Sequence, residues 1–240
     1  MSETPILLPE LGDVALHLRR SARARRFSLR VSRIDGSVTL TLPARARLAE
    51  ALAFARAQSA WLQAALDKLP QRHCPGFGDT LPFEGRALRI EPAALRAPRV
   101  EADCLLVPPG EERLGARLEA FLKHCARMRL QEASERHARA LGRPFRRITL
   151  RDTRSRWGSC AADGSLSYSW RLIMAPPEVL DYVAAHEVAH LAEMNHSPAF
   201  WAVVARLMPE YAPHRAWLKR HGAELQAIRL RDGGGAAVPH

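Results

Sequence analysis

The sequence predicts a mixed α+β fold in which short β segments alternate with helices. Residues 14–42 alternate between apolar and polar side chains, which is typical of half-buried strands. Residues 46–68 and 111–141 instead repeat their apolar side chains at helical spacing. Alternation returns over residues 145–172, and the chain after Pro176 again has helical spacing.

Composition restricts the class of protein but not its partner. The chain has 240 residues and a formal net charge of +11, and 33 of its 36 cationic side chains are arginine. Its 47% hydrophobic content excludes a wholly disordered chain. The arginine excess favours a polyanionic partner such as nucleic acid or a nucleotide. A GC-rich coding sequence would produce the same composition without any such partner, so both interpretations stay open.

An arginine-rich β-ribbon and a helix are predicted for residues 1–72. The turn at residues 34–37 (Ile-Asp-Gly-Ser) separates two apolar runs, which is a strong hairpin signal. Arginines from Arg19 to Arg33 crowd this ribbon. They form either a solvated basic face or a face that binds nucleic acid. The helix over residues 46–68 follows, and Pro70 ends it.

Three further segments complete the predicted organisation. Residues 73–110 form a small β segment, because short alternating runs there lie among Pro and Gly. Residues 111–232 form the main domain, and a flexible tail is expected over 233–240. No internal sequence repeat is evident.

Cysteine use and the lack of targeting signals predict a cytoplasmic protein. The four cysteines contain no CxxC pair, which favours a reducing compartment over a disulfide framework. The N-terminus has no basic region followed by an apolar core, so no signal peptide is expected. No stretch approaches the roughly 18 apolar residues of a membrane-spanning helix, so we expect no membrane partner.

The segment richest in chemistry is residues 179–201, which begins with a predicted helix. His186 and His190 are four residues apart, so both imidazoles lie on one helix face and can reach one metal ion. Glu187 lies beside them and completes an HExxH arrangement. In that arrangement the glutamate is a general base, and zinc lowers the pKa of a bound water.

His196 is the candidate for a third ligand. In a continuous helix it would lie about 9 Å beyond His190 and point away from it. Asn195 tolerates a left-handed conformation, and Ser197 followed by Pro198 is typical of the start of a new helix. The sequence therefore predicts a break that returns His196 to the other two histidines.

We expect one Zn²⁺ ion at the neutral imidazoles of these three histidines. Three protein ligands with a fourth position open for water are typical of catalytic zinc. Glu187 would take a proton from that water and return it to the leaving group. Glu193 or Asp181 is a candidate acceptor that orients a ligand imidazole, although either can instead be a solvent-facing charge.

Three motifs combine in this chain: SRWGSC at 155–160, DYVAAHEVAHLAEMNH at 181–196 and SPAFW at 197–201. Together they resemble the YgjP-like metallopeptidase family, a relative of the SprT-like and WLM zinc proteases, and the resemblance covers nearly the whole chain. It implies a zincin-like metallopeptidase domain, with the three histidines as metal ligands and Glu187 as the base. Ser169 departs from the pattern, because Asn is expected there.

The resemblance also implies a sheet edge beside the metal that pairs with an extended peptide. The strand at residues 156–160 is our candidate for that edge, with Arg154, Arg156 and Trp157 as candidate substrate-binding residues. Trp157 is alternatively a core residue. A thiolate ligand at Cys160 would close the open coordination position, so none is expected.

Three functions are compatible with these features. The first is a zinc-dependent peptidase. The second is a metal-dependent nucleoside triphosphate pyrophosphohydrolase of UTP type, an activity also assigned within the resembled family. The third is a DNA-associated protease tethered through the arginine-rich ribbon. Zinc chemistry does not separate the first two, and the fold favours the peptidase. The phosphate alternative depends on four arginines that could clamp phosphate oxygens: Arg151, Arg154, Arg156 and Arg171.

Overall fold

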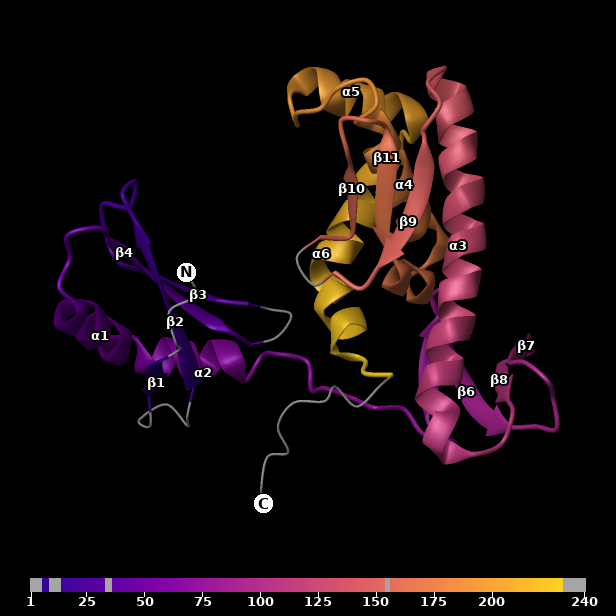
Figure 1. Ribbon diagram of the computed structural model, residues 1–240, viewed down its shortest axis with the longest axis horizontal. Helices are drawn as coiled ribbons and strands as arrows, with labels where there is room; N and C mark the ends of the chain where they lie inside the picture. The colour runs from indigo at the N-terminus through magenta and orange to yellow at the C-terminus, as the bar shows by residue number, and fades with distance from the viewer. Residues whose placement is uncertain (1–5, 9–13, 33–35, 154–155, 231–240) are drawn as a thin grey trace. The chain divides into compact units, whose positions relative to one another are not determined.

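The computed structural model describes residues 6–8, 14–32, 36–153 and 156–230. The chain forms two compact units that divide after Gln71 (Figure 1). Each unit has its own hydrophobic core. The predicted tail at 233–240 and part of the predicted turn at 34–37 lie outside the described residues.

The first unit is a four-stranded sheet with two short helices. Strands β3 and β4 pair antiparallel, which confirms the predicted hairpin. Strand β2 pairs with β4 in parallel, an arrangement that alternation alone does not reveal. The sheet order is β1-β2-β4-β3, and the strands are β1 (Ile6–Leu8), β2 (Val14–Ser21), β3 (Ser28–Val31) and β4 (Val38–Pro43).

Two helices, α1 (Leu48–Ala57) and α2 (Ser59–Leu66), replace the single helix predicted over residues 46–68. The chain leaves the helical conformation at Gln58, whose φ is −99° and ψ is 15°. Both helices contribute buried apolar side chains to one core with the sheet. That core consists of Leu16, Val38, Leu40, Leu42, Ala51, Ala55 and Leu62.

The described arginines of the ribbon lie at the surface of the first unit. Arg19 pairs in register with Thr41, and Arg30 with Thr39, so both project from the same face of the sheet. Arg20 instead donates to the carbonyl oxygens of Ala44 and Ala46. A solvated basic face agrees with these positions.

The second unit begins with the β segment predicted over residues 73–110. Its sheet order, β5-β6-β8-β7, and its strand directions are the same as those of the first unit's sheet, although the sequence contains no repeat. Its buried side chains join the core of the helices that follow. The strands are β5 (Thr80–Phe83), β6 (Arg86–Pro92), β7 (Arg99–Glu101) and β8 (Cys104–Val107).

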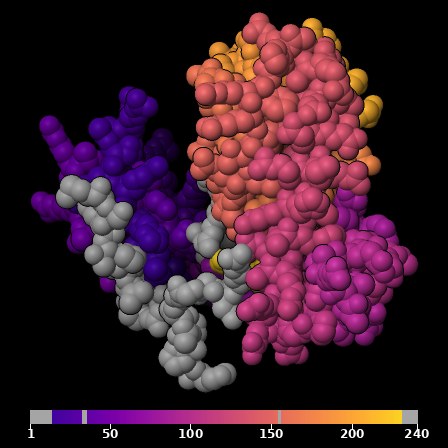
Figure 2. Space-filling model, turned by 45° about the vertical axis from the view of Figure 1, so that its right-hand side comes forward, coloured from indigo at the N-terminus to yellow at the C-terminus, as the bar shows by residue number. Residues whose placement is uncertain are grey.

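The predicted long helix is confirmed as α3 (Leu114–Leu141), which follows the 3-10 turn η2 (Glu111–Arg113). It ends at Gly142, whose φ of 74° is left-handed and favours glycine. In Figure 2 the surface of α3 extends along this unit, with residues of the β5–β8 sheet at its lower end. Its buried side recurs at helical spacing through Leu114, Leu118, Leu122, Ala126 and Leu130.

A three-stranded sheet and three helices complete the second unit. The sheet order is β10-β11-β9, so β10 is an edge strand of this sheet. The elements are β9 (Arg147–Arg151), β10 (Gly158–Cys160), β11 (Ser165–Ser169), η3 (Trp170–Met174), α4 (Pro177–Ala189), α5 (Pro198–Leu207) and α6 (Tyr211–Ala227).

No helix in the described part of the chain is both long and apolar enough to cross a membrane.

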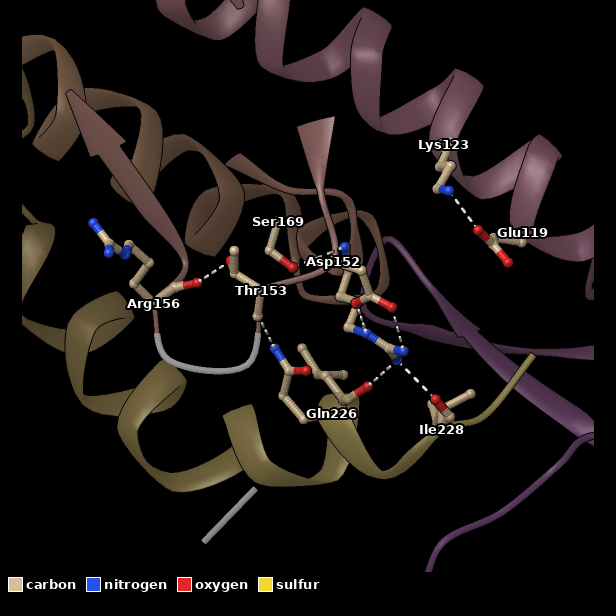
Figure 3. Close-up of polar contacts among 10 residues, drawn as sticks. Glu119, Lys123, Asp152, Thr153, Arg156, Ser169, Gln226 and Ile228 are labelled. Atoms are coloured by element: carbon tan, nitrogen blue, oxygen red, sulfur yellow. Dashed lines mark hydrogen bonds and ion pairs between the residues drawn. The ribbon is translucent and has the colours of Figure 1, made fainter. Parts of the chain in front are cut away.

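Arg171 joins the end of the three-stranded sheet to α6, so it is not available as one of the four arginines that could clamp phosphate in the alternative function. The residue is only 5% exposed. Its Nε lies 2.7 Å from Oδ1 of Asp152, and its Nη1 donates to the carbonyl oxygens of Leu225 and Ile228 (Figure 3). Ser169 caps the same turn, because its hydroxyl accepts from the Arg171 N–H. These bonds use the guanidinium donors inside the protein.

Replacing Arg171 by leucine is expected to destabilise the protein by about 3 kcal/mol, because buried carbonyls and a carboxylate lose their donor. Urea unfolding measures this loss. Arg147→Leu removes an exposed arginine from β9 and is the control, with an expected change below about 0.5 kcal/mol. Equal unfolding free energies for the two variants would contradict this structural role.

Candidate metal centre

Helix α4 carries the first half of the candidate site and is buried on most of its surface. Pro177 opens the helix, where its missing N–H costs nothing. Val179, Val183 and Val188 are among its buried residues, and they fix the helix within the core of the second unit. His186 and His190 therefore project from a rigid element.

The chain turns after α4, as predicted. His190 is the C-terminal cap of the helix. The side-chain oxygen of Asn195 accepts from the Ser197 N–H at 3.1 Å, and the Ser197 hydroxyl accepts from the Phe200 N–H at 3.4 Å. Ser197 thereby caps α5. This turn brings His196 back to the two histidines of α4.

The three imidazoles converge with spacings that suit one metal ion. The nitrogen atoms that His186, His190 and His196 can offer lie within 4.8 Å of one another. The Nε2 atoms of His186 and His196 are 3.1 Å apart. Two nitrogens that share one tetrahedral zinc, each about 2.0–2.1 Å from the ion, would be about 3.3 Å apart. The cluster therefore fits a shared metal ion.

The protonation of the cluster also suits metal binding. Burial, together with the neighbouring imidazoles, lowers the pKa of His186 to about 3. Burial likewise lowers the pKa of His190. Because the histidines at these two positions are neutral at neutral pH, each keeps a lone pair on one ring nitrogen.

Neither carboxylate expected to orient a ligand imidazole, that of Glu193 or that of Asp181, does so in the structure. The Nδ1 of His190 lies 2.9 Å from the backbone carbonyl oxygen of Glu193, so the ring N–H donates to the main chain rather than to the carboxylate. This bond leaves Nε2 of His190 for a metal. Asp181 instead binds His137 at 2.7 Å and also contacts Arg136, both on α3. Asp181 therefore joins two helices and does not orient a ligand.

Glu187 is enclosed beside the cluster, and only 5% of it is exposed. Burial raises the pKa of Glu187 to about 8, an effect that the charge of Arg156 partly offsets. A Cβ atom built on Gly158 would lie only 2.5 Å from Oε1 and 2.6 Å from Cγ of Glu187. The glycine of the SRWGSC motif is thus the surface against which this carboxylate packs, a role that the sequence did not reveal.

A cavity of about 420 Å³ opens over the histidines and Glu187. Arg156 and Trp157 line it, while the predicted neighbour Arg154 lies outside the described residues. The indole of Trp157 also packs against Gly222 of α6, so Trp157 is both a packing residue and a wall of the cavity. Burial, followed by the charge of Glu187, raises the pKa of Cys160 to about 11, which keeps that thiol protonated.

Aromatic side chains from α5 hold the imidazoles in place. Phe200 stacks on the ring of His190, with ring centroids 4.4 Å apart. Trp201 stacks on the ring of His196 at 6.0 Å. The SPAFW motif therefore supplies both the cap of α5 and the packing of two candidate ligands, although sequence reasoning identified only the cap.

Comparison with known proteins gives a family match over most of the chain. The family model described as YgjP-like, metallopeptidase domain, matches residues 25–221. No curated protein matches the chain significantly. Among solved structures, the metallopeptidase zymogen of Pyrococcus abyssi abylysin is similar at 20% identity with a TM-score of 0.36. That similarity covers 42% of this chain and 98% of the abylysin chain.

Proposed function

This chain belongs to the YgjP-like metallopeptidase family, and from that premise we propose that it hydrolyses peptide bonds as a zinc-dependent enzyme with Glu187 as its general base. The observation that carries the proposal is the convergence of three histidines beside one enclosed carboxyl group. His186, His190 and His196 would hold the zinc ion. When bound there, zinc acts as a Lewis acid that activates water and polarises the scissile carbonyl.

The residues of the chain have separate tasks in this proposal. Glu187 accepts a proton at its carboxylate and returns it to the leaving amine. Its atoms occupy the space that a side chain at residue 158 would fill. The backbone carbonyl of Glu193 fixes the ring of His190, and Phe200 packs against the same ring. These contacts keep the candidate ligands and the base in one geometry before substrate binds.

A peptide substrate is supported by the position of β10 at the edge of its sheet. The carbonyl oxygen of Trp157 and the N–H of Ala161 both bond to the β11 side. Because successive residues of an antiparallel strand direct their backbone groups to opposite sides, those of Gly158 and Cys160 point away from β11. An extended peptide can pair with these two residues beside the metal ligands.

The two alternative functions have less support. The hypothesis of nucleotide hydrolysis can no longer count Arg171 as a phosphate ligand, because its guanidinium donates to Asp152 and to two backbone carbonyl groups. A nucleic-acid contact through the ribbon stays a prediction. Such a contact predicts that DNA affinity falls steeply as salt is added, because binding of the arginines to phosphates releases counterions from the DNA.

Replacing His196 by alanine is expected to lower zinc affinity at least tenfold, because the third ligand is lost. Zinc competition against a chromophoric chelator measures the affinity. His124→Ala changes an exposed histidine on α3 and is the matched control, with wild-type affinity expected. If His196→Ala binds zinc as tightly as the wild type, His196 is not a ligand.

A further inference from the structure

The outer face of the sheet that contains β10 carries a second cavity, of about 320 Å³. Ser159, Ser167 and Thr149 lie side by side in register across the three strands, so they share one face. Arg151 lies two residues beyond Thr149 on β9 and therefore projects from that same face. The cavity is lined there by Arg151, Arg156, Thr153, Ser159 and Ser167.

This cavity is cationic and contains no acidic side chain among the described residues that line it. The nearest carboxylate in sequence, Asp152, is bound to Arg171. Figure 3 shows the side chain of Arg156 extending away from that ion pair. Within the described ranges, neither Arg151 nor Arg156 forms an ion pair. Both side chains are exposed, so their guanidinium groups are available to an anionic ligand.

A peptide paired with the edge of β10 would present its side chains to both cavities. Successive side chains of an extended strand alternate between the two faces of a sheet. Side chains on the face of Gly158 would lie toward Glu187 and the candidate metal ligands. Their neighbours would lie on the face of Ser159, where Arg151 and three hydroxyl groups surround the outer cavity.

We propose that this outer cavity is a specificity subsite that binds an acidic side chain of the peptide substrate. The inference rests on the proposed peptidase function and adds a substrate class to it. Arg151 and Arg156 supply paired guanidinium donors to the carboxylate, and the hydroxyls of Thr153, Ser159 and Ser167 line the same space. Arg156 also lines the cavity over the three histidines, whereas Arg151 lines only the outer cavity. Substituting Arg151 therefore tests the outer cavity alone.

The test uses the zinc-loaded full chain and a set of neutral peptides that each carry one Glu, at successive positions, paired with the same peptides carrying Gln there. We expect kcat/KM to favour Glu over Gln by about tenfold at one position, and the ratio to shrink as salt is raised. In Arg151→Gln the ratio should fall to about one. Arg147→Gln removes the same charge from the same face of β9, about 13 Å away, and should keep the wild-type ratio.

Binding to the inactive Glu187→Gln protein gives a second readout, in which the same peptide pair should differ in Kd by a similar factor. Equal rates for Glu and Gln peptides at every position would overturn the subsite and leave the peptidase proposal intact. A preference for Glu that survives Arg151→Gln would also overturn it. Cleavage of no peptide, neutral or acidic, together with hydrolysis of nucleoside triphosphates, would overturn the proposed function itself.

Discussion

Replacing Glu187 by glutamine is expected to reduce kcat/KM for peptide hydrolysis by about 10²- to 10⁴-fold, because the proposed general base is lost while the shape of the side chain is kept. Glutamine cannot take a proton from the attacking water. The loss should lie mainly in kcat, because substrate pairing with β10 does not involve this side chain. Initial rates on an unstructured protein substrate measure it.

The same variant should keep its metal and its fold. The three candidate histidine ligands are unchanged, so one zinc per chain is expected by elemental assay. The metal-free variant should be at least as stable as the wild type, because it no longer buries an ionisable carboxyl group. Glu193→Gln is the matched control, since only the backbone carbonyl of Glu193 contacts the cluster. Full activity in Glu187→Gln would remove Glu187 from the mechanism.

Replacing Gly158 by alanine is expected to lower kcat/KM by about 10²-fold or more. The added methyl group would lie within 2.5–2.7 Å of three atoms of Glu187, and that side chain is too enclosed to move aside freely. Displacing a catalytic group by about 1 Å has an effect of this size. Overpacking should also cost about 1–3 kcal/mol of unfolding free energy. Rates and urea unfolding measure the two effects separately.

Gly76→Ala is the matched control for this substitution. A methyl group at Gly76 would meet its nearest neighbour, Oδ2 of Asp79, at 3.6 Å, which is ordinary van der Waals contact. Wild-type activity is expected there. If Gly158→Ala were as active as Gly76→Ala, the close packing of strand β10 on Glu187 would not matter to the reaction.

The sequence predicts the candidate ligand cluster well because each signal is local. The spacing of His186 and His190 requires only helical geometry. His196 can approach the other two histidines only if the helix breaks before it. Asn195 and Ser197 predict that break, and the structure contains it. Capping residues act over three or four positions, so a single sequence is sufficient to identify them.

Features that depend on contacts between distant segments could not be predicted. The sequence leaves Arg171 as a possible phosphate clamp, because nothing in it shows that Asp152 and the carbonyl groups at the end of α6 surround this side chain. Gly158 was placed on a strand near the cleft, but its contact with Glu187 arises only when β10 packs on α4. The parallel pairing of β2 with β4 was hidden for the same reason, because alternation specifies a strand but not its partner.

The most direct test of the central claim compares zinc-loaded wild-type protein with Glu187→Gln on a panel of unstructured proteins and, separately, on the four ribonucleoside triphosphates. We expect the wild type to cleave the proteins, a chelator to abolish this cleavage and added zinc to restore it. We expect Glu187→Gln to cleave the same proteins at least about 10²-fold more slowly. Release of phosphate or pyrophosphate that disappears in Glu187→Gln, without cleavage of any protein, would contradict the peptidase proposal.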